Sequence, residues 1–342
     1  MKNIILGALL LILAYQSRSQ DINSSQFYAL PSNVNPAFTG FFNNDYYVAA
    51  AYKNQWSSVS APFQTVGATG QVSLLKNKRP NSIVGVGVDI IHDRAGSTSF
   101  NTSLFNLNVS YLQVLDVKRQ HIIGVGFQNS LVMRRFDLSK ATFGNQFNGY
   151  DGFDQGINPG ESGLNTKQLD YNLGIGGLYT YSPKEHNNVY VSFSAFNLTR
   201  PNVSFYDNTE HRLYTRFTAF AGGEVSLKGS WSLLPSAIFQ KQGPSMEIMV
   251  GSFARYGLVR NRKEMLGINF GVWYRVNDAV VPAVKVEYKG FNITVNYDIN
   301  VSKLTKVSRF NGSGEISISY SGLLFKEHKK PTKPIFCPTA GF

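Results

Sequence analysis

Apolar and polar residues alternate with a period of two along many segments of this 342-residue chain. In Phe291–Asp298, Phe, Ile, Val and Tyr alternate with Asn, Thr, Asn and Asp, and Phe105–Tyr111, Val189–Ala195 and Ile316–Tyr320 follow the same pattern. Because successive side chains of a β-strand point to opposite faces, each segment is predicted to be a strand with one apolar and one polar face. The pattern therefore predicts an all-β chain.

The length of these segments favours a transmembrane β-barrel over a β-sandwich. Many of them run beyond the roughly five or six residues usual for globular strands. Aromatic residues gather near their ends, as at Tyr46-Tyr47, Tyr111 and Tyr320, which is typical of interfacial girdles. Only 16% of the residues are charged, against about 25% in an average soluble domain. The apolar face of each strand is thus expected to meet lipid.

Fourteen segments have strand character: 44–55, 62–75, 82–93, 98–115, 121–136, 168–181, 188–196, 212–227, 230–240, 245–256, 263–277, 279–288, 290–299 and 313–325. Boundaries read from a sequence are uncertain by about two to four residues, so twelve or sixteen strands stay open. An even number suits bacterial single-chain barrels. We predict a single-domain outer-membrane barrel of about 14 antiparallel strands.

The first 19 residues have the features of a signal peptide, with a basic start at Lys2, an apolar stretch over Ile4–Ala14 and cleavage expected before Gln20. Removal of Lys2 and Arg18 lowers the formal net charge from +12 to +10. The expected localisation is the outer membrane. We divide the rest into a periplasmic or plug segment (20–43), the barrel (44–325) and a basic periplasmic tail (326–342).

If the N-terminus lies in the periplasm, the long connections 139–167, 197–211 and 300–312 are extracellular and the short turns are periplasmic. Many cations then fall on the periplasmic turns and tail. The candidate docking residues are Lys76, Lys78, Arg79, Lys118, Arg119, Arg260, Arg262, Lys263, Lys329 and Lys330. This basic rim could meet anionic lipid headgroups or dock an acidic periplasmic partner, and the sequence leaves both open. A nucleic-acid partner is not expected.

The polar face of the strands is expected to line the lumen. By alternation the lumen-facing residues include Asp89, Gln128, Arg134, Arg216, Glu224, Glu247, Arg255, Asn269, Arg275, Lys285, Glu287 and Asp298. In an eight-stranded barrel, side chains just fill the lumen. A barrel of fourteen strands encloses more space. Opposite charges in the bore are compatible with a cross-braced, closed interior or with a water-filled pore.

No catalytic, cofactor-binding or metal-binding residues are predicted. The five His residues lack metal-ligand spacing, and Gly174–Gly177 does not open a helix. Asn148–Gly156 matches a calcium loop only loosely, because such a loop needs acidic ligands at positions 1, 3 and 5 and a Glu at position 12. Cys337 stands alone in a Pro-rich tail and has no assigned role.

Motifs occur in a fixed order along the chain: Asn35-Pro36-Ala37-Phe38-Thr39-Gly40, Tyr52-Lys53-Asn54-Gln55-Trp56, Asp93-Arg94-Ala95-Gly96, Leu169–Gly174, Ser194–Pro201, Tyr297–Leu304, Gly314–Ile318 and Cys337-Pro338. In this order and spacing they resemble the PorP/SprF family of outer-membrane proteins of the Bacteroidota type IX secretion system. The family commonly has Arg in place of Lys53, and its Cys-Pro pair usually lies closer to the last residue.

The resemblance implies a non-enzymatic component of the secretion and gliding machinery that helps export or anchor a secreted adhesin with a type IX C-terminal domain. It also implies periplasmic partners, namely a peptidoglycan-binding lipoprotein and the ring lipoproteins. The motif positions with expected structural or docking roles are Asn35, Pro36, Gly40, Gln55, Trp56, Asp93, Gly96 and Asp298. The competing hypothesis is a diffusion porin or small-solute transporter, which would conduct ions.

Overall fold

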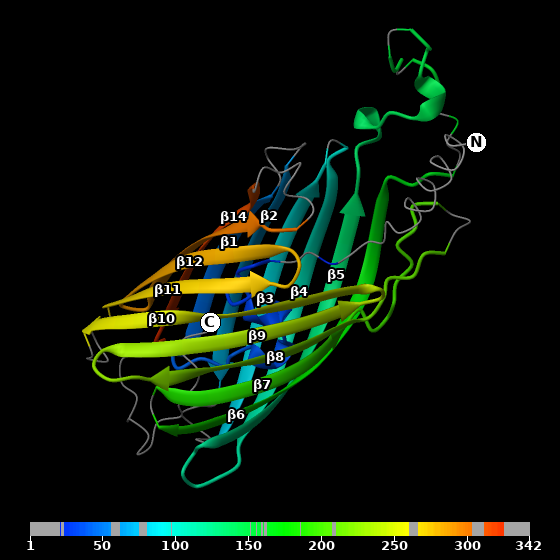
Figure 1. Ribbon diagram of the computed structural model, residues 1–342. Helices are drawn as coiled ribbons and strands as arrows, with labels where there is room; N and C mark the ends of the chain where they lie inside the picture. The colour runs from blue at the N-terminus through cyan, green and yellow to red at the C-terminus, as the bar shows by residue number, and fades with distance from the viewer. Residues whose placement is uncertain are drawn as a thin grey trace.

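The computed structural model describes residues 21, 24–55, 62–74, 81–96, 98–150, 152–154, 156–158, 160, 163–184, 186–206, 210–259, 266–302 and 311–324. In this part of the chain, fourteen strands form one closed antiparallel barrel (Figure 1). The predicted fold class is confirmed, and the strand count is fourteen. No helix among the described residues is long and apolar enough to cross a membrane.

The strands are β1 (Tyr46–Gln55), β2 (Phe63–Leu74), β3 (Ser82–Ala95), β4 (Phe100–Val114), β5 (His121–Arg135), β6 (Lys167–Lys184), β7 (Asn187–Phe196), β8 (Arg216–Ser226), β9 (Trp231–Gln242), β10 (Ser245–Val259), β11 (Leu266–Arg275), β12 (Ala279–Tyr288), β13 (Phe291–Asn300) and β14 (Asn311–Gly322). Each corresponds to a predicted segment. The largest difference at a strand start is at β8, which begins at Arg216 and not at residue 212, because residues 212–215 belong to the preceding connection.

The barrel closes where β1 pairs with β14, from Tyr46 opposite Gly322 to Gln55 opposite Ser313. We call the rim where β1 begins and β14 ends the inner rim, and the opposite end the outer rim. The outer rim carries the two long connections 136–166 and 197–215, whereas inner-rim turns such as 227–230 and 289–290 are short. This asymmetry is typical of outer-membrane barrels and identifies the inner rim as periplasmic.

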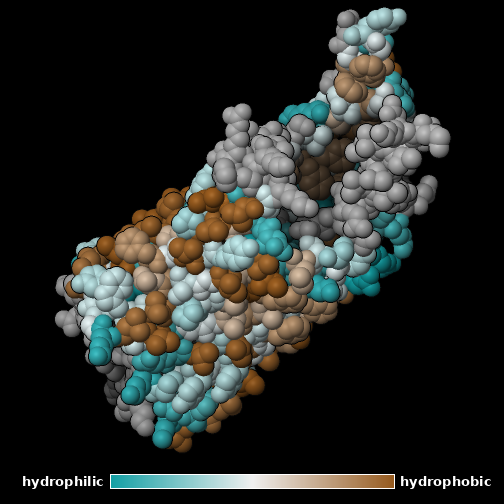
Figure 2. Space-filling model, viewed as in Figure 1, coloured by the Kyte–Doolittle hydropathy of each residue, from teal (hydrophilic) through white to brown (hydrophobic). Residues whose placement is uncertain are grey.

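The outer wall of the barrel is apolar. Along β5, exposed and buried residues alternate, so that Phe127 and Leu131 are about half exposed while Gln128 and Ser130 are buried in the lumen. Apolar side chains cover much of the wall that Figure 2 shows. Aromatic pairs lie near the inner rim, including Phe291 and Tyr320, whose ring centroids are 4.3 Å apart. The predicted orientation of the two faces is confirmed, because the exposed apolar side chains point away from the lumen.

The wall is tallest at β6, which has 18 residues and extends beyond its neighbour β7. The connection 197–215 packs along the free outer half of β6. Leu198 donates a backbone hydrogen bond to Leu173, and an isolated bridge joins Leu164 and Tyr206. The connection therefore partly replaces the missing strand partner of β6.

Candidate functional site

The residues before β1 pass through the lumen and form the candidate site, which we call the N-terminal segment (residues 24–45). At the outer rim, Asp21 lies 3.5 Å from Arg216 and donates its backbone N–H to Gln242. At the inner rim, Asp45 donates its backbone N–H to Gly322. The chain thus descends from the outer mouth to the inner rim before it rises as β1. The sequence analysis took the N-terminus to be periplasmic and left open whether residues 20–43 form a plug; residues 1–20 lie outside the described part of the chain.

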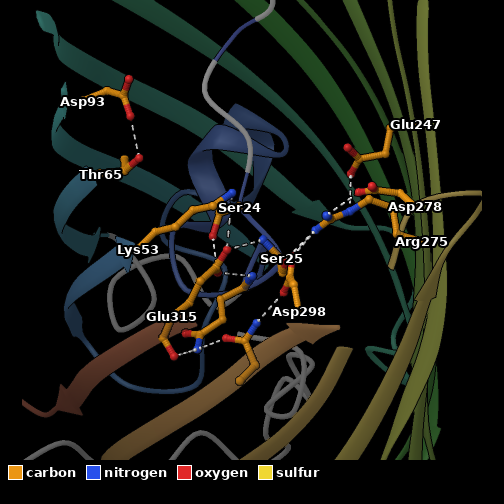
Figure 3. Close-up of polar contacts among 12 residues, drawn as sticks. Ser24, Ser25, Lys53, Thr65, Asp93, Glu247, Arg275, Asp278, Asp298 and Glu315 are labelled. Atoms are coloured by element: carbon orange, nitrogen blue, oxygen red, sulfur yellow. Dashed lines mark hydrogen bonds and ion pairs between the residues drawn. The ribbon is translucent and has the colours of Figure 1, made fainter. Parts of the chain in front are cut away.

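A carboxylate on β14 holds the beginning of the segment. Glu315 accepts hydrogen bonds from the Ser24 hydroxyl at 2.7 Å and from the backbone N–H of Ser25 and Gln26 at 2.9 and 2.8 Å (Figure 3). The Lys53 ammonium lies 3.6 Å away. Two backbone donors that would otherwise be buried without partners are satisfied by one side chain, which fixes the height of the segment in the barrel.

Next to it, Arg275 at the outer end of β11 joins three carboxylates. It lies 3.1 Å from Asp298, 2.9 Å from Asp278 and 3.7 Å from Glu247. Asp298 in turn accepts a hydrogen bond from the Ser25 hydroxyl at 2.7 Å (Figure 3). Charges from several strands are thereby connected through the N-terminal segment, and the lumen is bridged at the outer mouth.

Below this polar layer, the lumen has an aromatic core. Phe27 packs edge-on against Phe220 of β8 with ring centroids 5.4 Å apart, and Tyr28 packs against Phe253 of β10 at 5.6 Å. Phe38 contacts Phe220 and Tyr190. All of these side chains are buried. Full burial of a large apolar side chain contributes about 1.5–3 kcal/mol, so this layer stabilises the contact between segment and wall.

A second polar layer surrounds Asp89 of β3. The Asp89 carboxylate accepts hydrogen bonds from Ser32 of the segment at 2.9 Å, from Thr69 at 2.6 Å and from Asn108 at 2.7 Å. A buried carboxylate is costly unless its oxygens are satisfied. Three donors, one of them from the segment, meet that requirement and tie the segment to β2, β3 and β4.

The motif Asn35–Gly40 lies in the inner half of the lumen. Asn35 is fully buried; its side chain accepts a hydrogen bond from Ala37 N at 2.8 Å and donates to the carbonyls of Gly177 and Phe193. Pro36 opens the short 3₁₀-helix η2 (Pro36–Phe38). Gly40 has a φ of +71°, a conformation that favours glycine. The motif therefore turns the segment and attaches it to β6 and β7.

The other motif positions are distributed along the barrel. Gln55 ends β1 at the outer rim, Asp93 accepts a 2.6 Å hydrogen bond from Thr65, and Gly96 has a φ of +65° in the turn after β3. Asp298 belongs to the outer cluster. Among the motif residues that the structure describes, Asp298, Asn35, Pro36 and Gly40 belong to the interface between segment and wall.

Several predicted residues lie outside the described part of the chain: Trp56, Lys76, Lys78, Arg79, Arg260, Arg262, Lys263, Lys329 and Lys330, together with residues 1–19 and 326–342. Of the candidate docking residues, Lys118 and Arg119 are described, in the inner-rim turn 115–120. Asp116 in the same turn has a lowered pKa: desolvation acts to raise it, but backbone N–H donors of His121 and Gln120 outweigh that effect. Asp116 thus links the ends of the turn through hydrogen bonds of 2.8 and 2.9 Å from Gln120 N and His121 N.

A further ion-pair network braces the wall itself. Arg255 lies 3.3 Å from Glu224 and 2.9 Å from Glu287, and Lys285 lies 3.3 Å from Glu287. These are residues that alternation placed in the lumen. They pair with one another in the bore, as a cross-braced interior requires. Within the described residues, no group of three or more His, Cys, Asp or Glu is arranged to hold a metal ion.

Fold and site together define a class: an outer-membrane β-barrel whose lumen is occupied by its own N-terminal segment. The model of the family described as "Type IX secretion system membrane protein PorP/SprF" matches residues 16–320. The chain belongs to this family, which makes it an outer-membrane component of type IX secretion. No curated protein matches the sequence.

Solved structures with similar outlines are bacterial channels and transporters. The CymD monoaromatic hydrocarbon channel is 9% identical with a TM-score of 0.45, and 89% of this chain and 94% of that chain are covered. The Ralstonia pickettii toluene transporter TbuX is 9% identical with a TM-score of 0.46, and 84% of this chain and 92% of that chain are covered. A Pseudomonas aeruginosa FadL homologue is 10% identical with a TM-score of 0.46, and 84% of this chain and 92% of that chain are covered. At these values the similarity carries no information about substrates.

Proposed function

We propose that this protein is a non-enzymatic docking component of the type IX machinery, which helps export or anchor a secreted adhesin at its outer rim and docks periplasmic lipoproteins at its inner rim. The observation that carries the proposal is the filled lumen of a barrel in a secretion family. A barrel occupied by its own chain offers binding surfaces at its two ends and no wide passage between them.

At the outer rim, the connection 136–166 presents an aromatic tip. Tyr150 is 95% exposed, and Phe147 and Phe153 are each 54% exposed, with ring centroids 5.5 Å apart. The Asn148 side chain accepts hydrogen bonds from the backbone of Tyr150 and Gly152, which gives the tip a defined shape. Exposed aromatic clusters are typical of protein-binding surfaces. This tip is the contact that we assign to the secreted partner.

At the inner rim, the turns between strands present exposed cations, among them Lys118, Lys184, Lys228 and Lys289. We extend the proposal to the candidate docking residues outside the described part, which the sequence analysis assigned to periplasmic turns and the tail. Such a rim attracts an acidic periplasmic surface by electrostatic steering, an effect that weakens as salt is added. Contact with anionic headgroups of the inner leaflet is the competing explanation, and it predicts no protein partner.

The porin hypothesis is disfavoured by the aromatic layer around Phe27, Tyr28 and Phe38, because it occupies the bore that a diffusing solute would need. Planar-bilayer recordings of the purified barrel are expected to show little steady conductance. A steady conductance typical of porins would refute the docking proposal. We also expect cleavage of the signal peptide near Ser19/Gln20, which N-terminal sequencing of the mature protein would test.

Affinity purification in mild detergent tests the docking proposal. The triple reversal Lys118→Glu, Arg119→Glu and Lys228→Glu should lose periplasmic lipoproteins but keep the secreted adhesin. Replacement of Tyr150 by Ala should weaken recovery of the adhesin alone. A matched control reverses Arg200, Arg212 and Lys241, which are exposed at the outer rim. Equal recovery of lipoproteins from the inner-rim variant, with the barrel folded, would contradict the assignment.

A further inference from the structure

A groove with a basic lining lies on the outside of the barrel wall at the outer ends of β3, β4 and β5. Its volume is about 610 Å³, and it is lined by His92, Arg94, Ser99, Asn101, Arg135, residues 136–139, Lys140 and Thr166. Arg94, Arg135 and Lys140 are all exposed. This groove takes no part in holding the N-terminal segment.

The strand register aligns the groove with a row of cations. Arg94 pairs with Asn101, Asn101 with Arg135, and Arg135 with Lys167, so that one row of outward-facing side chains crosses four strands. Four residues further down β3, Ile90 begins a parallel row that continues through Phe105 and Leu131. These side chains are 51%, 48% and 50% exposed on the lipid-facing wall. At about 3.3 Å per residue, the cations lie about 13 Å further along the strands.

Two of the cations converge on a single neutral group. The Arg94 guanidinium donates to the Ser99 hydroxyl at 3.1 Å, and the Lys140 ammonium donates to the same oxygen at 3.2 Å. Like charges held this close repel each other unless an anion lies between or beside them. Asp137 offsets the charge of Lys140 at 3.5 Å, and the charge of Arg94 is left for a ligand with a compact negative charge to balance.

Little of this charge is neutralised by the protein. The acidic residue that lines the groove, Asp137, is engaged by Lys140 at 3.5 Å and by Ser139. Among the described residues, no ion pair is found for Arg94, Arg135 or Lys167. Guanidinium groups suit phosphate, because their parallel N–H donors match its oxygens.

We propose that this groove binds the phosphate of an outer-leaflet glycolipid, with the acyl chains against Ile90, Phe105 and Leu131. The location selects this ligand. The cations face outward above an apolar wall at the outer rim, where the headgroup of a lipid lies when its chains cover that wall. A phospholipid of the inner leaflet would present its phosphate at the opposite rim.

Binding to the purified barrel in detergent micelles tests the proposal. The probes are monophosphorylated lipid A, the same lipid without its phosphate, phosphatidylglycerol and inorganic phosphate. The test variant carries Arg94→Gln, Arg135→Gln and Lys167→Gln. The matched control loses the same charge at the inner rim through Lys118→Gln, Lys184→Gln and Lys228→Gln. Heat-modifiable migration on gels verifies that each barrel is folded.

We expect the wild-type protein and the control to bind the phosphorylated lipid about tenfold or more tightly than the test variant. Removal of the phosphate from the lipid should reduce binding to the level of the variant. Unchanged binding by a folded test variant would overturn the proposal. So would equal binding of phosphatidylglycerol, which would indicate unspecific attraction of anionic lipids, or of inorganic phosphate, which would indicate a site for a soluble anion.

Discussion

At Gly126 in β5, the barrel wall and the backbone of the N-terminal segment lie in direct contact. A Cβ atom at this position would lie 2.2 Å from Ala37 N and 2.3 Å from Pro36 C. Cβ atoms in proteins essentially never come closer than 3.0 Å to such atoms. The substitution Gly126→Ala must therefore displace the segment by about 1 Å, because the wall is fixed by hydrogen bonds to β4 and β6 and the interior is close-packed.

The size of the effect follows from the packing of the segment. Overpacking a tight interior costs about 1–3 kcal/mol. Since 1.4 kcal/mol corresponds to a factor of ten, the undocked population should rise about 5- to 150-fold. The barrel itself should persist, because Ala fits a β-strand and the pairs Ser110–Gly126 and Gly126–Gly176 remain.

Single-channel recording in planar bilayers measures this population directly, because ions pass when the segment leaves the bore. The wild-type protein should show rare, brief openings, and Gly126→Ala should show them more often by the stated factor. Gly70→Ala is the matched control, because an added Cβ there meets nothing within 4 Å. If Gly126→Ala and Gly70→Ala open equally often, the segment does not block the bore and the reasoning fails.

Three further predictions concern the ends and the turn of the N-terminal segment and the inner rim. Asn35→Ala should lower the free energy of unfolding in micelles by at least about 2 kcal/mol, because it leaves buried backbone groups unpaired; a loss below about 0.5 kcal/mol would contradict the role of Asn35. Cysteine at Asp21, in a Cys337→Ser background, should react in intact cells with a maleimide that does not cross membranes, whereas cysteine at Lys289 should not; the opposite pattern would reverse the orientation of the segment. The pKa of the Asp116 carboxyl is lower in the folded protein than in the unfolded chain. Its stabilisation of the turn is therefore complete above the pKa of the unfolded chain, about 4, and is lost as the pH falls through the lower pKa of the folded protein. Amide exchange at Gln120 should therefore lose protection in acid, and Asp116→Asn should remove this pH dependence; equal pH dependence in both proteins would contradict it.

The barrel could be predicted because the sequence pattern that defines each strand lies within that strand. Period-two alternation defines each strand from its own residues, and neighbours in sequence are neighbours in the sheet. Strand ends were less certain, as at Arg216, because residues 212–215 have strand-like composition but pair with the loop 197–206. There the tertiary contacts of the outer rim override the local pattern.

The path of the N-terminal segment was not predictable, because its contacts are remote. Ser24 and Glu315 are separated by 291 positions, and neither belongs to a pattern that signals the other. A partial signal does exist: Gly85, Gly126 and Gly176 are lumen-facing glycines, and an added Cβ at each would lie within 2.2 Å of the segment. Glycines on the inward face of neighbouring strands mark the path of a second chain segment inside a barrel.

The occupied lumen also constrains how the protein can assemble. A closed barrel has no side opening, and a chain with side chains as large as Phe27 and Tyr28 cannot thread past a finished, cross-braced interior. The segment must therefore lie against the sheet before β1 and β14 join, and its most distant partner, Glu315, belongs to the last strand. Contacts of such large sequence separation form slowly, because the loop must close before they contribute. Pairing of β1 with β14 should thus be the late, rate-limiting step of folding. The N-terminal segment then reaches its native contacts only after β14, the last strand, has formed.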